Sequence, residues 1–456
     1  MNKRWLKLAA VPITLSFVAA ACGSDDDGDA GSSEDTTAAT EAPAEGGDAV
    51  EGKTEITVTG PERDESEVGG IQAGLDVWGA ENGVEVTYIG DADWEANVNT
   101  QVEGGNPPDI SFFPQPGKLA GFARDGVLKP LNDDAAAATA ANWPDAWNAF
   151  GNVDGVQYGV PGSANLKSLV WYQPDKFEEA GYTVPTTFDE FTALVDQITA
   201  DGGPKALCVG IESGQATGWT YTDWVEDMVL RQHGPDVYDQ WVDHEIPFND
   251  PRIVESMDTV LGIFAEENVF ANSGTIAATA FQDNGQPLVD GDCFMHRQAS
   301  FYTAFIPEGT AFADGTPGAV DVFYFPDING DAPVLGAGIL GAAFNEDPNV
   351  HSLLAWISTP EYAEARQVKQ QELKGGGLAL SGFLSAANGQ DLSLYQPLEQ
   401  SFLDILASAA IVRFDASDLM PAEVGAGTFW TEGTAAVNGD KTAQEAADAI
   451  EASWPS

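Results

Sequence analysis

The segment GVQYGVPGSANLKSLVWYQPDKF, residues 155–177, holds two strand-like runs and then a turn. The runs contain the valine, leucine and aromatic side chains that are enriched in strands, whereas proline and aspartate mark the turn. Similar short runs recur on both sides of this segment. They alternate with longer stretches that have the mixed faces of helices, and this alternation decides the fold class.

Strands and helices are expected to follow one another along the chain. The sequence EITVT, residues 55–59, has apolar side chains at alternating positions, as a half-buried strand does. Further strands are expected at residues 84–89 and 107–113, and helices at residues 71–81, 187–200, 222–232, 251–267 and 346–373. Strands that alternate with helices predict α/β layers built on mostly parallel sheets.

The first residues have the pattern of an export signal. Basic residues at positions 3, 4 and 7 precede a short apolar run over residues 8–18, and three alanines then lead to Cys22. This order is typical of a secretory signal peptide, and a cysteine after small residues resembles a bacterial lipobox. We therefore expect a signal peptide over residues 1–21 and a lipid anchor on Cys22. The alternative is ordinary signal cleavage beside an incidental cysteine.

Acidic and small residues follow Cys22. Residues 23–52 include no aromatic and no basic side chain, so this stretch cannot bury enough apolar surface to fold. We expect a disordered, acidic tether over residues 22–53. No later stretch has about 18 consecutive apolar residues, so no transmembrane helix is expected.

Composition limits the partners. The remaining chain of roughly 400 residues is too long for one core, which predicts two domains. The net charge of −53 argues against nucleic acid and anionic lipid surfaces as partners. It also disfavours a strongly anionic ligand, because like charges repel at long range.

Two cysteines remain besides Cys22. Cys208 and Cys293 form an even pair in a chain with an export signal, and an oxidising compartment favours a disulfide between them. No metal site is expected, because neither cysteine lies in a CxxC motif and the four histidines lack ligand spacing.

Four motifs carry a family resemblance. They are PPDISFF (107–113), DGVQYGVP (154–161), LVWYQPDKF (169–177) and, near the end of the chain, DLMPAEVGAGTFWTEGTAAVNGDKTAQEAADAI (418–450). Their order after a strand, a helix and a strand resembles the extracellular solute-binding proteins of ABC importers. The sugar-binding group that includes maltose-binding protein is the most similar.

The resemblance implies a two-lobe periplasmic-binding-protein fold of the α/β class. A hinge crossed more than once would join the lobes, and the ligand would bind in the cleft between them. Mapped onto this chain, lobe one takes residues 54–165 and 334–412, and lobe two takes residues 166–333 and 413–456.

Two further motifs, ESGQATGWTYTDWVED (212–227) and DCFMHRQASF (292–301), resemble α-glucoside-binding components of bacterial importers. The implied function is a lipid-anchored receptor on the outer face of the cell membrane. It would bind an α-glucoside or another small oligosaccharide and deliver it to the permease subunits of an ABC importer. The resemblance implies a monomer that performs no catalysis and needs no cofactor.

The chemistry of a sugar indicates which side chains could bind it. Its ring faces expose C–H groups and its edges expose hydroxyl groups, so a sugar site needs flat aromatic side chains together with carboxylates, amides and cationic groups. Glu62 and Arg63 lie in the loop after the first strand, and Trp219 lies in a glycine-rich loop before a helix. Gly338, in VLGAGILG, would let backbone amides approach the ligand.

The resemblance adds further candidates. Trp430, in GTFW, matches the sugar-stacking tryptophan of the family. His296, Arg297 and Gln298 stand at the family's second stacking position, which no aromatic fills here, and Arg297 or Gln298 would substitute hydrogen bonds. The added ligand-binding candidates are Gln115, Asn165, Lys167, Arg297, Gln298 and Trp430.

Several of these residues have structural alternatives. Lys167 is equally compatible with a salt bridge in the hinge. Asp109 is expected to fix its loop through backbone bonds, Trp224 to lie in the core, and Arg413 and Asp418 to tie the lobes together.

Two other functions fit the composition. A secreted glycoside hydrolase would need two carboxylates about 5–10 Å apart, and 72 acidic residues leave many possible pairs. The same fold could instead bind a polyol, a peptide or a zwitterionic osmolyte, whose cation would sit among aromatic rings such as those of Phe113, Trp219 and Trp430.

Overall fold

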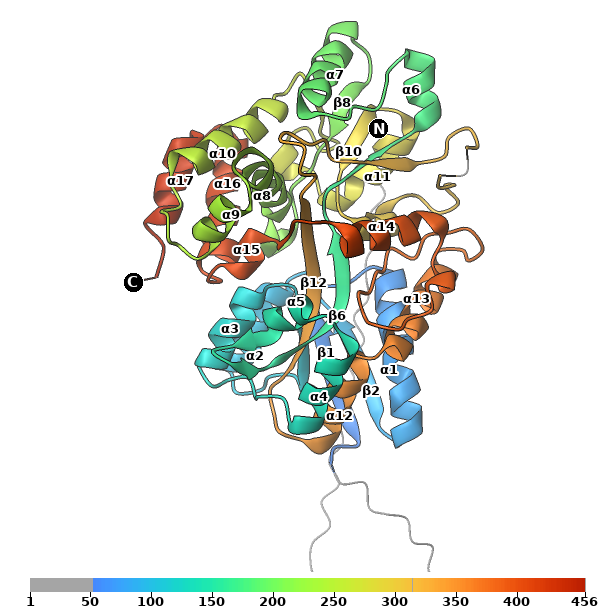
Figure 1. The fold of residues 1–456 in the computed structure, drawn as a ribbon, viewed down its shortest axis with the longest axis vertical. Helices are drawn as coiled ribbons and strands as arrows, with labels where there is room; N and C mark the ends of the chain where they lie inside the picture. Colours follow the sequence, from blue (N-terminus) through green and yellow to red (C-terminus); the bar gives the residue numbers. More distant parts are fainter. Residues whose placement is uncertain (1–51, 314, 456) are drawn as a thin grey trace, which may run out of the picture. The chain divides into compact units, whose positions relative to one another are not determined.

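The computed structural model describes residues 52–313 and 315–455. They form two α/β lobes, each built on its own sheet (Figure 1). The predicted signal peptide, Cys22 and the predicted tether up to residue 51 lie outside the described residues. Within the described part of the chain, no helix combines the length and the apolar content needed to cross a bilayer.

The first sheet has the strand order β13-β12-β3-β1-β2, and β6 pairs with β12. Its strands are β1 (Glu55–Gly60), β2 (Glu85–Gly90), β3 (Ile110–Phe113), β6 (Gly159–Leu166), β12 (Val334–Ala343) and β13 (Val412–Phe414). The helices of this lobe are α1 (Glu65–Asn82), α2 (Trp94–Glu103), α3 (Pro116–Arg124), α4 (Asp133–Asn142), α5 (Asp145–Asn148), α12 (Pro348–Ile357) and α13 (Pro360–Leu373). Apolar side chains of α1, α12 and the central strands form one buried cluster.

The second sheet has the order β11-β7-β10-β8-β9. Its strands are β7 (Leu169–Tyr172), β8 (Lys205–Cys208), β9 (Val269–Phe270), β10 (Cys293–Arg297) and β11 (Asp321–Tyr324). Around it lie α6 (Pro174–Ala180), α7 (Phe188–Asp201), α8 (Trp219–His233), α9 (Pro235–Val242), α10 (Pro251–Ile263), α11 (Gly285–Asp290), α15 (Ala416–Leu419), α16 (Trp430–Val437) and α17 (Ala443–Glu451).

Both sheets are mixed, so the expectation of mostly parallel sheets is wrong. β1 runs parallel to β2 and β3, but β12 runs antiparallel to β3 and β6. In the second sheet β7 runs antiparallel to both of its neighbours. The reason is the hinge: β6 leads out of the first lobe and β12 returns into it, so the two lie side by side in opposite directions (Figure 1).

Local chemistry explains where the observed elements depart from the predicted ones. The helix expected at 71–81 begins at Glu65, because Asp64 and Glu67 form a capping box there. The single helix expected at 346–373 is two helices. Pro360 starts the second one, since proline lacks the N–H and the space that a helix interior requires.

Helix α14 (Pro397–Ser408) joins the core of the second lobe. Its Phe402 lies 6.2 Å from Trp171 of β7, measured between ring centroids, and Leu403 belongs to the same buried cluster. The predicted boundaries place α14 in lobe one, because they assign the whole of 334–412 to that lobe. The boundaries themselves stay a prediction.

One edge of the first sheet is partly covered by a side chain. β2 is the edge strand, and Gln72 of α1 donates from Nε2 to the carbonyl oxygen of Val86 (2.7 Å) and accepts at Oε1 from the backbone N–H of Tyr88 (2.8 Å). The amide therefore satisfies backbone groups that would otherwise face outward from the strand.

The predicted disulfide is confirmed. Cys208 ends β8 and Cys293 begins the neighbouring strand β10. Their Cα atoms lie 5.5 Å apart, and their sequence separation is 85. The bond therefore closes a long loop inside the second lobe.

Replacing both cysteines with serine should lower the free energy of unfolding by about 2–4 kcal/mol, because the unfolded chain regains the entropy of the open loop. Chemical denaturation with and without dithiothreitol measures this effect. The reductant should destabilise the wild type and leave the Cys208→Ser/Cys293→Ser variant unchanged. A wild type that is insensitive to reduction would contradict the assignment.

Candidate ligand-binding cleft

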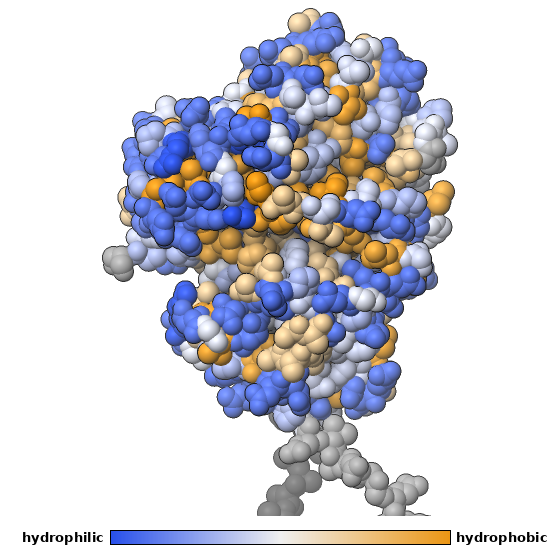
Figure 2. Space-filling model, in the orientation of Figure 1, coloured by the Kyte–Doolittle hydropathy of each residue, from blue (hydrophilic) through white to orange (hydrophobic). Residues whose placement is uncertain are grey.

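A cavity lies between the two lobes. Its walls come from the loops after β1 and β3, from β6 and β12 near the hinge, from α8, and from the segment that leads into α16. On the face that Figure 2 shows, apolar residues gather at the level between the lobes, whereas hydrophilic residues cover the outer parts. Eight of the predicted site residues line the cavity: Glu62, Arg63, Gln115, Asn165, Lys167, Trp219, Gly338 and Trp430.

Two predicted site residues lie elsewhere. Arg297 is buried inside the second lobe, where its Nη2 donates to Oδ2 of Asp227 at 2.7 Å. Gln298 accepts from the N–H of Ala299 at 2.8 Å, and neither side chain lines the cavity. The end of β10 turns these side chains into the core, so neither stands at the cavity wall in this structure.

Gly338 lines the cavity for a reason other than the predicted one. A Cβ atom there would lie 2.4 Å from the carbonyl oxygen of Ser163 and 3.0 Å from the ring of Trp147. Glycine is therefore required by the packing of β12 on β6.

The loop after β1 supplies a carboxylate that is held in place. Glu62 accepts at Oε2 from the hydroxyl of Tyr88 (3.0 Å), and its Oε1 lies 3.6 Å from Nη2 of Arg366. Tyr88 is buried on β2. The sheet itself thus fixes the side chain of Glu62 at the mouth of the cleft.

Arg63, the next residue, reaches across the cleft. Its Nη2 lies 3.5 Å from the hydroxyl of Ser213, and its guanidinium carbon lies 5.7 Å from the ring centroid of Phe281. Both partners belong to the second lobe. Lys374, which follows α13, likewise donates to the carbonyl oxygen of Ala304 in that lobe at 2.7 Å.

Aromatic side chains form the wall contributed by the second lobe. Trp219 is the first residue of α8 rather than part of a loop, and its ring centroid lies 5.0 Å from that of Phe281 and 6.1 Å from that of Phe301. All three line the cavity together with Phe305. The rings of this aromatic wall are packed edge to face or tilted. The wall is apolar, and the face of one of its rings can stack on the C–H face of a sugar ring.

Trp430 is the first residue of α16 and follows a π-helical turn, Val424–Phe429. Such turns are often found at functional sites. The indole is buried, and its Nε1 has no hydrogen-bond partner among the described residues. It therefore presents an unused donor at the cavity.

Lys167 joins three segments at the hinge. It lies between β6 and β7, and its Nζ contacts Oδ1 of Asp223 on α8 at 2.8 Å and Oδ2 of Asp415 just after β13. Its Nζ also lies 5.5 Å from the ring of Trp219. Lys167 is thus both a hinge ion-pair partner and a part of the cavity wall, so the two alternatives for this residue coexist.

Four acidic side chains surround Lys167, and their proximity shifts the pKa of the lysine and of several of the acids. They are Asp223, Glu226, Asp415 and Asp418. Burial alone would lower the pKa of Lys167, but Asp223 and Asp415 raise it well above its usual value. Burial raises the pKa of Glu226 and of Asp418, and the charge of Asp415 adds to the effect in both cases. Asp415 is buried too, but its contact with Lys167 holds its pKa below the usual range.

A cation of the protein already contacts this acidic group. Carboxylate oxygens of Asp223, Glu226 and Asp415 approach within 4.8 Å of one another. Lys167 contacts the first and the third, and Glu226 accepts from the backbone N–H groups of residues 416 and 417. We assign the group to charge compensation in the hinge.

The structural alternatives for the other residues are resolved by their contacts. Asp109 accepts from the N–H of Thr57 at 3.0 Å and from Asn345 at 2.7 Å, so it fixes its loop. Trp224 is buried on α8. Arg413 pairs with Asp239 of α9 at 2.5 and 2.7 Å, which ties β13 to the second lobe.

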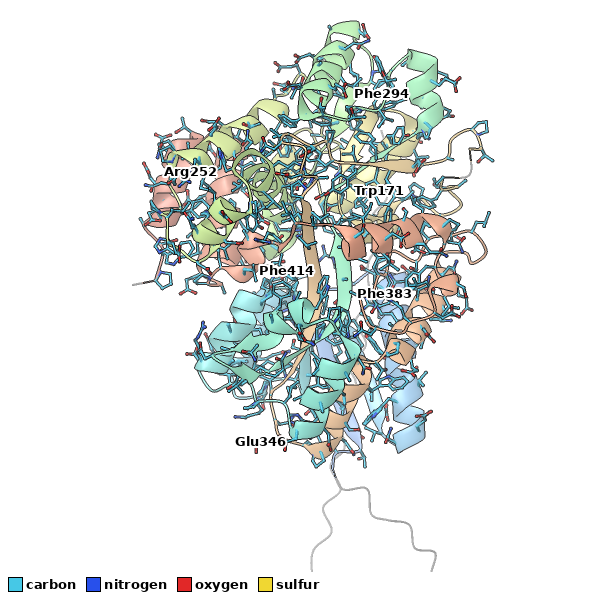
Figure 3. All side chains as sticks on the ribbon, viewed as in Figure 1. Trp171, Arg252, Phe294, Glu346, Phe383 and Phe414 are labelled. Atoms are coloured by element: carbon cyan, nitrogen blue, oxygen red, sulfur yellow. A yellow bond between two sulfur atoms is a disulfide. The ribbon has the colours of Figure 1, made fainter. Side chains whose placement is uncertain are left out.

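Sequence reasoning missed the residues that α13 and the following loop bring to the cavity. Arg366, Gln370 and Phe383 line it, together with Glu67 of α1. Figure 3 shows Phe383 at the level where the lobes meet. The sequence feature that could have indicated these residues is the run of glycines at the start of α1. Glycines there allow another helix, in this case α13, to pack closely against that face.

Comparison with known proteins identifies the class of protein to which this chain belongs. The fold is that of two-lobe solute receptors. The bacterial solute receptor AcbH superposes with a TM-score of 0.73 at 19% identity and covers 87% of this chain and 97% of its own. Maltose-bound MalE3 of T. maritima gives a TM-score of 0.64 at 17% identity and covers 87% and 98%.

Residues 64–364 match the family model of bacterial extracellular solute-binding proteins, and the chain belongs to that family. The osmoprotective compounds-binding protein GgtB of Synechocystis sp. is 38% identical over 381 residues, which cover 82% of this chain and 86% of GgtB. The alpha-glucosides-binding periplasmic protein AglE of Rhizobium meliloti is 34% identical over 420 residues, which cover 88% and 87%. Members of this family are receptors and not enzymes, so the glycoside hydrolase alternative is set aside.

Replacing Lys167 with methionine should lower the free energy of unfolding by about 3–5 kcal/mol, because it leaves buried carboxylates without their cation. Denaturant titration at neutral pH measures the change. The control is Arg124→Met, which breaks the pair with Asp154, where both side chains are mostly exposed. That pair should contribute at most about 1 kcal/mol. Equal losses in the two variants would contradict the role of Lys167.

Glu67 should make the fold less stable as the pH rises. Burial, followed by the charges of Glu62 and Asp64, raises its pKa from 4.5 to about 7. The folded state therefore keeps a proton that the unfolded chain releases, and this contribution is complete below pH 4.5 and lost as the pH passes 7.

In Glu67→Gln, which keeps a neutral side chain at every pH, the loss of stability between pH 4 and 8 should be smaller by about 1–3 kcal/mol. Thermal unfolding across this range is the measurement. Glu65→Gln removes an exposed charge from the same turn and should follow the wild type. Parallel curves for Glu67→Gln and the wild type would refute the assignment.

Proposed function

We propose that this protein is an extracellular receptor that binds a neutral sugar or a related polyol in the cleft and presents it to an ABC importer. The observation that carries the proposal is the set of unpartnered buried polar atoms in the cavity wall. The acceptors are Glu62 Oε1, Gln115 Oε1, Asp223 Oδ2 and Gln370 Oε1, and the donors are Arg366 Nε and Nη1 and Trp430 Nε1.

A hydroxylated ligand fits this set. A buried polar atom without a partner costs about 1–3 kcal/mol, and each hydroxyl group of a sugar can both donate and accept. The aromatic wall of Trp219, Phe281 and Phe301 would cover the C–H face of the same ligand. Two relatives have names that agree with this class, since AglE is named for alpha-glucosides and GgtB for osmoprotective compounds.

Contacts from both lobes would let the ligand favour the closed form. A ligand shifts such an equilibrium only through contacts that it makes preferentially in one state. Glu62 and Gln115 belong to the first lobe, Trp219 and Trp430 belong to the second, and Lys167 lies between the lobes. A ligand that spans the cavity would join all three parts.

The remaining features of the proposal concern the cell surface. We propose that Cys22 is lipidated after removal of residues 1–21, that residues 22–53 act as the tether, and that the receptor works as a monomer. The permease subunits of an importer are the expected partner.

A cationic osmolyte is the second candidate. Six acidic side chains line the cavity, against three basic ones: Glu62, Glu67, Glu95, Asp223, Asp415 and Asp418 stand with Arg63, Lys167 and Arg366. Burial raises the pKa of Glu67, Glu95, Asp223 and Asp418, so part of this excess is uncharged. An excess of carboxylates beside aromatic rings is the environment that a quaternary ammonium group prefers.

A thermal-shift screen separates the two candidates, because binding to the folded state alone raises the melting temperature. Maltose, trehalose or another neutral sugar or polyol should raise it, and glycine betaine should not. A response to betaine alone would replace the proposed ligand class. The same screen on Trp430→Phe and on Trp143→Phe, a buried tryptophan outside the cavity, should show a smaller shift only for Trp430→Phe.

A further inference from the structure

A further segment joins the two lobes beside the hinge strands β6 and β12. It begins at the end of α13, which packs on the first lobe, where a Cβ atom on Gly74 of α1 would lie 2.8 Å from the ring of Tyr362. It ends at α14, which packs on the core of the second lobe through Phe402. Residues 374–396 therefore have one end on each lobe.

Three consecutive glycines stand at the start of this segment. Gly375, Gly376 and Gly377 have φ angles of +106°, +64° and +61°, and a Cβ atom on any of them would meet no atom of another part of the chain within 4 Å. Packing therefore does not require glycine at these positions. The N–H groups of the first two donate to the carbonyl oxygens of Glu372 and Gln371 and so end α13. The third extends the run beyond what a helix end needs, and such a run has the backbone freedom of a hinge.

The chain beyond the glycines is fixed to the second lobe. Glu399 of α14 is buried, and its Oε1 accepts from the N–H groups of Ser381 and Gly382 at 2.7 and 3.1 Å and from the hydroxyl of Ser381 at 2.6 Å. The carbonyl oxygen of Gly377 accepts from Nε2 of Gln396, just before α14, at 3.0 Å. A movement of one lobe against the other would thus be concentrated in the glycines.

Lys374 connects the two lobes across the glycines. It directly follows α13 and is half-buried, and its Nζ donates to the carbonyl oxygen of Ala304 at 2.7 Å. Ala304 belongs to the short helical turn Ser300–Phe305, which packs in the core of the second lobe. Burial lowers the pKa of Lys374, whereas the charges of Asp64 in the first lobe and Glu308 in the second raise it. The ammonium group thus stands between carboxylates of both lobes.

We propose that Gly375–Gly377 form a glycine hinge and that Lys374 restrains it. By binding Ala304 from the first-lobe side of the glycines, Lys374 keeps the hinge from bending and favours the arrangement in which the lobes meet. The contact lies outside the cavity, since neither Lys374 nor the glycines line it. The restraint would raise the affinity for any ligand that needs both lobes, because the binding-competent form is then more populated. Only this effect on affinity rests on the proposed function.

The acidity of the chain gives this restraint its importance. The net charge is −53, and like charges on two bodies oppose their approach. A cation placed between Asp64 and Glu308 lowers that cost where the lobes meet. Arg63 also reaches the second lobe, but it lines the cavity, so its replacement would alter the ligand contacts as well. Lys374 is the position at which the effect can be isolated.

The test combines small-angle X-ray scattering and isothermal titration on the full-length protein. Without sugar, Lys374→Met should have a larger radius of gyration than the wild type. Saturating maltose or trehalose should return the radius to the wild-type value, because the ligand supplies closing contacts of its own. The affinity of the variant for these sugars should be about 3- to 10-fold lower. Lys374→Gln should give the same results and serves if the methionine variant fails to fold.

Two further variants make the result specific. Lys374→Arg keeps the positive charge and an N–H donor at the same position, so it should match the wild type in radius and in affinity. Lys369→Met removes a lysine of the same helix that pairs with Glu372 on the surface. It should also match the wild type, because that pair does not connect the lobes.

The outcomes distinguish this inference from the proposed function. An unchanged radius of gyration in Lys374→Met and Lys374→Gln would overturn the restraint. A larger radius that persists in a sugar-saturated variant would also overturn it, because damage within a lobe produces that pattern. So would a Lys374→Arg protein that behaves like Lys374→Met. A wild type that binds neither maltose nor trehalose would contradict the proposed ligand class, and the scattering without sugar would then decide on the restraint alone.

Discussion

The buried contact of Lys167 with Asp223 and Asp415 is the constraint on which the rest of the structure depends. It joins the first crossing of the hinge, the helix that begins with Trp219 and the segment that leads to Trp430. A charge is costly to bury unless it is paired, so these three segments must meet in one arrangement. Because Trp219 and Trp430 each begin a helix anchored near this contact, the ion pairs also fix where the aromatic faces stand in the cleft.

The two lobes contribute different chemistry to the cavity. The second lobe supplies rings, with Trp219, Phe281 and Phe301 packed edge to face or tilted. The first lobe supplies buried polar atoms that have no hydrogen-bond partner among the described residues, above all on Glu62 and Arg366. A ligand with one apolar face and one hydroxylated edge would satisfy both walls at once.

Much of this arrangement could be predicted from residue patterns, and the failures have physical causes. Alternating apolar positions located β1, short strand-like runs located β2 and β6, and the cysteine pair was correct. Strand direction was not predictable, because it depends on how the hinge returns the chain. Eight of ten candidate residues line the cavity. Arg297 and Gln298 do not, since a single sequence does not show into which layer the end of β10 turns. Arg366 and Gln370 were missed because nothing local distinguishes a buried arginine on α13 from an exposed one.

Gln72 has a consequence beyond the lobe in which it sits. An open strand edge is a template onto which another chain can add. By occupying the carbonyl of Val86 and the N–H of Tyr88, the amide of Gln72 acts as a one-residue substitute for a further strand. The strand of another molecule therefore finds two fewer free backbone groups on this edge.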